Sequence, residues 1–173
     1  MQYRQLARRT LGTLAITFAV TLPLTSSSYA DEELPVLATA NASDSKLGDS
    51  YIEVNEVKRS SEGGYTQVTW TLRARGGVDY DSSKQENELY YYLENGMSGV
   101  TALDKENQIR YHPLQDEKKV CMCAGTYRPV NFITTVGDEK SSPYWNSFLF
   151  PESTSEISLE FPGFEPTQKI SLK

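Results

Sequence analysis

Polar and apolar residues alternate along most of the chain after residue 50, which predicts β-strands and little helix. In the segment YTQVTWTLRA, one face holds Val68, Trp70, Leu72 and Ala74, and the other holds Thr69, Thr71 and Arg73. Such a pattern is typical of an antiparallel sheet with one side in the core. The segment YIEVNEVK alternates at Ile52 and Val54 and loses its phase before Val57, which predicts a β-bulge.

Further strand-like segments follow, separated by Gly, Pro, Asn and Asp. They are residues 89–103, 109–114, 131–136, 143–150, 157–161 and 168–172. About seven or eight short strands at regular spacing indicate an all-β fold, an antiparallel β-sandwich, with an up-and-down barrel as the alternative. The predicted core is Ile52, Val54, Val68, Trp70, Leu72, Val100, Leu103, Tyr111, Phe148, Phe150, Ile157, Leu159 and Ile170.

The first 30 residues have the pattern of a secretory signal peptide. Arg4, Arg8 and Arg9 precede an apolar run over residues 11–24, and Ser28-Tyr29-Ala30 suits cleavage. About 14 apolar-biased residues are too few to cross a bilayer. The pair Arg8-Arg9 leaves open whether export is by the Sec or the twin-arginine route. We therefore expect a protein that is secreted or associated with the cell envelope.

The residues after the signal divide into two parts. Residues 31–49 are small and polar without a period of 2 or 3.6, which predicts a flexible leader. Residues 50–173 then form the folded domain. The chain carries a net charge of −6, which becomes −9 without residues 1–30. Such an acidic surface repels phosphates, so we expect neither nucleic acid nor an anionic membrane as partner. No later segment predicts a membrane span.

The only two cysteines, Cys121 and Cys123, lie in the segment VCMCAG. In an exported chain an even pair predicts a disulfide, and the Cα atoms of residues i and i+2 can reach bonding range. The closed loop is tiny, so the bridge is expected to stiffen one turn. Two alternatives stay open. One is a redox-active disulfide, and the other is a copper site that adds Met122 and His112 as ligands.

Catalytic patterns are weak. His112 is the only histidine, and a Cys–His pair would need it to face a cysteine that is expected to be oxidised. Residues 79–83 alternate oxygen-bearing side chains, but Lys84 and Tyr90 replace the glycine and glutamate of an EF-hand loop. The sequence therefore predicts a non-catalytic domain with no metal and no cofactor.

Aromatic residues suggest a binding surface. Along a strand Tyr90 and Tyr92 share one face, and Tyr144 and Trp145 lie together further on. Amphipathic rings suit contacts with sugars or proteins, although tyrosine is also a common strand former. We expect Tyr90, Tyr92, Tyr144 and Trp145 to bind a protein or a cell-envelope component.

Three spaced motifs occur within residues 99–123: Gly-Val-x-x-Leu-Asp, Tyr-x-Pro-Leu-x-Asp and Cys-x-Cys. A strand ending in Phe-Pro and a strand running into Pro-Gly-Phe follow. The positions are Gly99, Val100, Leu103, Asp104, Tyr111, Pro113, Leu114, Asp116, Cys121, Cys123, Phe150, Pro151, Pro162, Gly163 and Phe164. The pattern resembles a domain of exported actinobacterial proteins, and the strand order is similar to immunoglobulin-like secreted antigens of mycobacteria. The resemblance implies an immunoglobulin-like β-sandwich and implies no catalytic residues.

Overall fold

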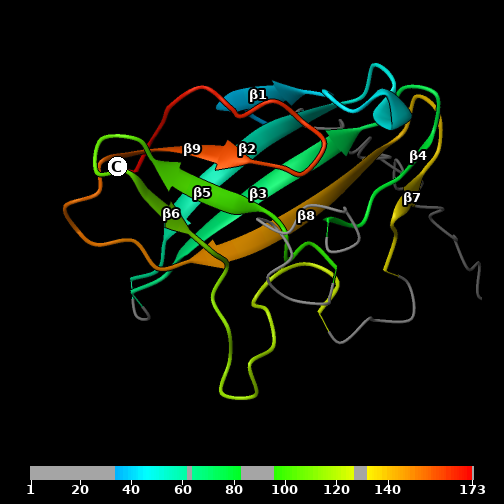
Figure 1. Cartoon of the computed structure of the whole chain (residues 1–173). Helices are drawn as coiled ribbons and strands as arrows, with labels where there is room; N and C mark the ends of the chain where they lie inside the picture. Colours follow the sequence, from blue (N-terminus) through cyan, green and yellow to red (C-terminus); the bar gives the residue numbers. More distant parts are fainter. Residues whose placement is uncertain (1–33, 62–63, 83–95, 127–131, 173) are drawn as a thin grey trace, which may run out of the picture. The chain divides into compact units, whose positions relative to one another are not determined.

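The computed structural model describes residues 34–61, 64–82, 96–126 and 132–172. Over these residues the protein is all-β with antiparallel strand pairing, as the alternation predicted (Figure 1). The described part contains ten strands and one short 3-10 helix, η1 (Ser45–Leu47).

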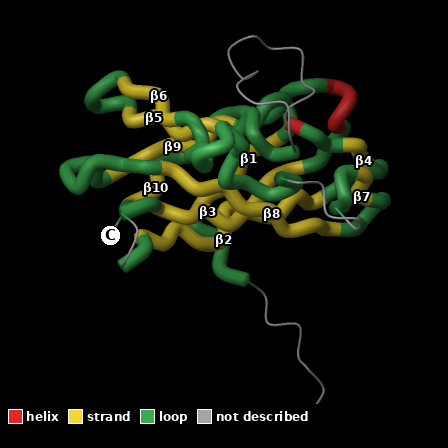
Figure 2. The backbone as a smooth tube through the Cα atoms, turned by 90° about the horizontal axis from the view of Figure 1, so that it is seen from below, coloured by secondary structure: helices red, strands yellow, loops and turns green. Residues whose placement is uncertain are grey.

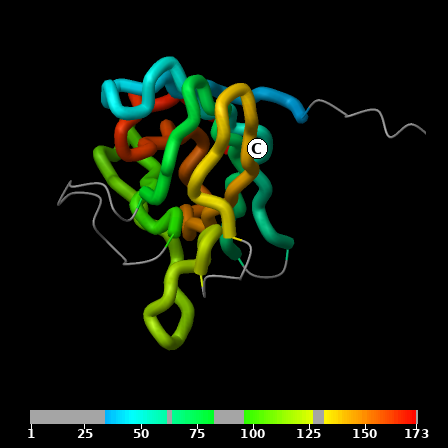
Figure 3. Tube along the Cα trace, turned by 90° about the vertical axis from the view of Figure 1, so that its right-hand side faces the viewer, coloured from blue at the N-terminus to red at the C-terminus, as the bar shows by residue number. Residues whose placement is uncertain are grey.

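The strands form two four-stranded sheets and one two-stranded pair. Sheet 1 has the order β1 (Ala38–Asn41), β2 (Tyr51–Arg59), β3 (Thr66–Arg73) and β8 (Ser141–Phe148). Sheet 2 has the order β10 (Ile170–Ser171), β9 (Glu156–Glu160), β5 (Thr101–Asp104) and β6 (Ile109–Tyr111). The pair is β4 (Val78–Asp79) with β7 (Thr135–Val136), which lies at the end of the sheets that Figure 3 faces.

The two sheets share one hydrophobic core. In Figure 2, β5, β6 and β9 lie on one side and β2, β3 and β8 on the other. Trp70 of β3 is fully buried between them, with its ring 4.9 Å from that of Phe161 after β9 and 4.7 Å from that of Tyr144 in β8. Burial of apolar surface is the main favourable term in folding, so this cluster is what holds the sheets together.

Most of the predicted core is confirmed, and one residue is wrong. The structure buries all of the predicted set except Leu103 and Tyr111. Tyr111 is partly buried and packs against Phe150 with ring centroids 5.0 Å apart. Leu103 is only partly buried and lies outside the core, because Ala102 points inward and successive side chains of a strand face opposite ways.

The predicted bulge is confirmed. The β2–β3 register shifts between Val54 and Glu56, so Asn55 is the extra residue. Its side chain is buried and satisfied: its Oδ1 accepts from the Thr71 hydroxyl at 2.7 Å, and its Nδ2 donates to the Pro35 carbonyl at 3.0 Å. The bulge thus ties the segment before β1 to sheet 1.

The flexible leader predicted for residues 31–49 is wrong over its described part. Ala38–Asn41 forms β1 and pairs with β2, and η1 follows with Asp44 as its N-cap. The other side of β1 contacts the chain near β10, through a bridge between Ala42 and Phe164 and a bond from Glu165 N to Asn41 O of 2.9 Å. The strand forms because neighbours on both sides supply backbone partners, which no local pattern shows.

Candidate functional site

The outward side of β8 presents Trp145. Tyr144, Asn146 and Phe148 point into the core, so Trp145 points away from it and is 38% exposed. The β3–β8 register places Trp145 opposite Thr69 and Ser147 opposite Gln67. We call the outward side chains around this tryptophan the Trp145 face. They are Gln67, Thr69, Pro143 and Trp145; Thr71 and Ser147 lie on the same side of the sheet but are buried.

An open groove of about 350 Å³ continues this face at the end of the β2–β3 hairpin. Its lining residues are Lys58, Arg59, Ser60, Ser61, Tyr65 and Gln67. Gln67 is the diagonal neighbour of Trp145 across the strand pair, a relation that places side chains about 7–8 Å apart. The groove and Trp145 therefore form one continuous surface.

The predicted disulfide is present. Cys121 and Cys123 are joined with an S–S distance of 2.03 Å and a Cα–Cα distance of 5.3 Å, and both are buried. Their turn lies along the edge of β8, where Ser147 N donates to Met122 O at 2.9 Å and Ala124 N donates to Trp145 O at 2.8 Å. The turn therefore fixes the backbone of the strand that carries Trp145. The yellow-green loop leading to it extends away from the sheets in Figures 1 and 3.

Gly125 and Thr126, which follow the disulfide, complete the turn. The Thr126 hydroxyl lies within hydrogen-bond distance of the Cys121 carbonyl and 2.7 Å from the Cys123 carbonyl. Gly125 has φ +85°, and a Cβ there would lie 2.5 Å from the ring of Phe132. Only glycine fits this position, because both the backbone angle and the space exclude a side chain.

Asn146 is a structural residue that the sequence reasoning missed. It is fully buried, and its Oδ1 accepts from Trp70 Nε1 at 2.9 Å while its Nδ2 donates to Met97 O at 2.7 Å. Its backbone is bridged to Cys123. The side chain thus links the core tryptophan, the segment before β5 and the disulfide turn. The available signal was a polar residue at an inward position between Tyr144 and Phe148.

The predicted binding residues do not form one group. Tyr144 is 3% exposed, its hydroxyl donates to Ile133 O at 2.9 Å, and its ring packs on Trp70, so it is a core residue. Its prediction as a binding residue is wrong, because β8 turns alternate side chains to opposite sides. Tyr90 and Tyr92 lie outside the described residues. Trp145 is the predicted binding residue that the structure places on the surface.

His112 lies directly after β6. Burial and the nearby charge of Arg110 lower the pKa of its imidazole, so the neutral form predominates at neutral pH. Across the described ranges, no three His, Cys, Asp or Glu side chains are grouped closely enough to hold a metal ion. A copper site at the turn needs thiolates, and the sulfurs of Cys121 and Cys123 are bonded to each other.

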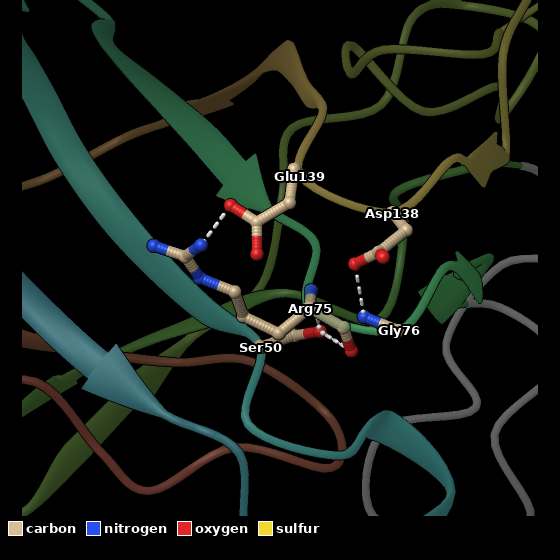
Figure 4. Close-up of polar contacts among 5 residues, drawn as sticks. All are labelled: Ser50, Arg75, Gly76, Asp138 and Glu139. Carbon is tan, nitrogen blue, oxygen red and sulfur yellow. Dashed lines mark hydrogen bonds and ion pairs between the residues drawn. The ribbon is translucent and has the colours of Figure 1, made fainter.

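A cluster of polar contacts joins the turn after β3 to the loop before β8 (Figure 4). Arg75 forms an ion pair with Glu139, and Gly76 N donates to Asp138 Oδ1 at 2.7 Å. The Ser50 hydroxyl accepts from Arg75 N at 2.9 Å. These contacts hold the turn after β3 against the loop before β8. We therefore assign this cluster a structural role.

The chain was compared with known protein families, with curated proteins and with solved structures, and none of the three comparisons gave a match. In the portion of the chain that the structure describes, no helix has the length and apolar character needed to cross a membrane.

Proposed function

We propose that the protein is an exported, non-catalytic domain of immunoglobulin-like β-sandwich architecture. We propose further that it binds a protein or a cell-envelope component through the Trp145 face. Two separate four-stranded antiparallel sheets around a single core support the sandwich. The signal-like first 30 residues support export.

The exposure of Trp145 carries the binding proposal. Tryptophan is enriched among the residues that dominate binding energy, and an exposed one on a sheet face is a suitable anchor. Its backbone is held on both sides, by β3 through the strand register and by the disulfide turn through Ala124. A rigid support lowers the entropy cost of binding.

The test is a cross-linking pulldown from the native cell envelope with the processed protein. Trp145→Ala should remove the captured partner and leave the melting temperature nearly unchanged, because the side chain lies outside the core. Ile109→Ala is the matched control, since Ile109 is a similarly exposed apolar residue (44%) on β6 of the other sheet. Capture that survives Trp145→Ala, or that falls equally with Ile109→Ala, would contradict the proposal.

A further inference from the structure

We infer that the Trp145 face and the adjoining groove bind a polysaccharide that carries carboxylates on its sugar rings. This inference rests on the proposed function and names the ligand class of the same surface. It combines the exposed ring of Trp145, the Tyr65 side chain in the groove, and the charge of the groove lining.

The charges of the groove favour an acidic ligand. Among the described residues that line it, Lys58 and Arg59 carry charge and both are basic, although the whole chain is acidic. Arg59 is held in place because its guanidinium donates to the carbonyls of Pro151 and Thr154 at 3.3 and 3.0 Å. Lys58 is exposed, so its ammonium can contact a ligand carboxylate. Opposite charge across an interface supports specificity and fast association.

The remaining lining favours sugars. Ser61 and Gln67 offer a hydroxyl and an amide group, which can donate and accept hydrogen bonds with sugar hydroxyls. Tyr65 and Trp145 offer flat amphipathic rings. Trp145 is opposite Thr69, four residues along the strand from Tyr65, so the two positions are about 13 Å apart at the usual rise per residue. That spacing suits an extended chain of several rings.

The backbone of this face argues against a peptide. A peptide commonly binds a sheet by adding a strand, which requires a free edge. β3 lies between β2 and β8, and β8 is paired with β3 on one side and contacts the disulfide turn on the other. Recognition at this face must therefore use side chains.

The experiment is affinity electrophoresis of the processed protein in native gels that contain polygalacturonate, alginate or hyaluronan. We expect at least one of the three polymers to retard the protein, and the retardation to weaken with added salt. Trp145→Ala and Tyr65→Ala should each weaken the affinity about tenfold, as truncation of an aromatic anchor does. Highly methyl-esterified polygalacturonan is the matched probe, because it keeps the rings and loses the charge.

Two variants that each remove one charge should change the affinity for the polymer in opposite directions. Lys58→Gln should weaken binding, and Glu56→Gln should strengthen it, because Glu56 lies opposite Thr69 on the same outward side. Both side chains are exposed, so neither variant should affect folding. Ile109→Ala serves as the unaffected control.

Three outcomes would overturn the inference: no retardation by any of the three polymers, equal retardation by poly-L-glutamate, or retardation unchanged by Trp145→Ala. The envelope pulldown separates this failure from the failure of the proposed function. Capture that depends on Trp145 without polymer binding identifies a different partner and leaves the proposed function standing. Capture that does not depend on Trp145 refutes the proposed function itself.

Discussion

Replacing Asn146 by alanine should destabilise the protein strongly. The variant leaves Trp70 Nε1 and Met97 O, which bond to Asn146 at 2.9 and 2.7 Å, without these partners in the core. A buried polar group that loses its partner costs about 1–3 kcal/mol, so the two together cost about 2–6 kcal/mol. That is a large share of the roughly 5–15 kcal/mol that holds a typical domain folded.

The assay is urea unfolding followed by far-UV circular dichroism, with the unfolding free energy extrapolated to water. A double-mutant cycle with Trp70→Phe isolates one bond, because phenylalanine keeps most of the ring and removes the N–H donor. In the Trp70→Phe background, Asn146→Ala should cost about 1–3 kcal/mol less than in the natural chain. A cost below about 0.5 kcal/mol in the natural chain, or strictly additive costs, would refute the reasoning.

The other predictions concern the core, the bridge and the histidine. Tyr144→Ala should cost about 3–5 kcal/mol in the same unfolding assay, because Tyr144 packs on Trp70; a cost as small as that of Trp145→Ala would contradict its burial. Replacing Cys121 and Cys123 by serine should cost only about 1–2 kcal/mol for so short a loop, with faster hydrogen exchange confined to the turn and β8. Intact mass should rise by two hydrogen atoms on reduction, and an unchanged mass would exclude the bridge. Because the folded pKa of His112 is lowered, the unfolded chain binds the proton more readily, and stability should fall as pH drops below about 6.5. His112→Gln should flatten the stability curve in that window, and parallel curves for the two proteins would show that His112 does not contribute.

The residues of β8 show how much the alternation of side chains along a strand can predict. Phe148 and Phe150 were predicted to be in the core, and the even spacing from Phe148 already requires Tyr144 to point inward and Trp145 outward. The same parity places Asn146 inside. The alternation along β8 therefore distinguishes the core tyrosine from the surface tryptophan, although both are adjacent aromatic residues.

The all-β class, most of the core, the bulge in β2 and the disulfide could be predicted from the sequence, because each depends on alternation or on two residues close in the chain. The strand over residues 38–41 could not be predicted in this way, since its hydrogen-bond partners come from β2 and appear only in the folded protein. The tertiary structure also decided that Gln67 and its groove lie beside Trp145, a neighbourhood set by the β3–β8 register. Pairing between strands far apart in sequence depends on the fold as a whole, because every residue except proline has the same backbone donor and acceptor, which carry no local signal.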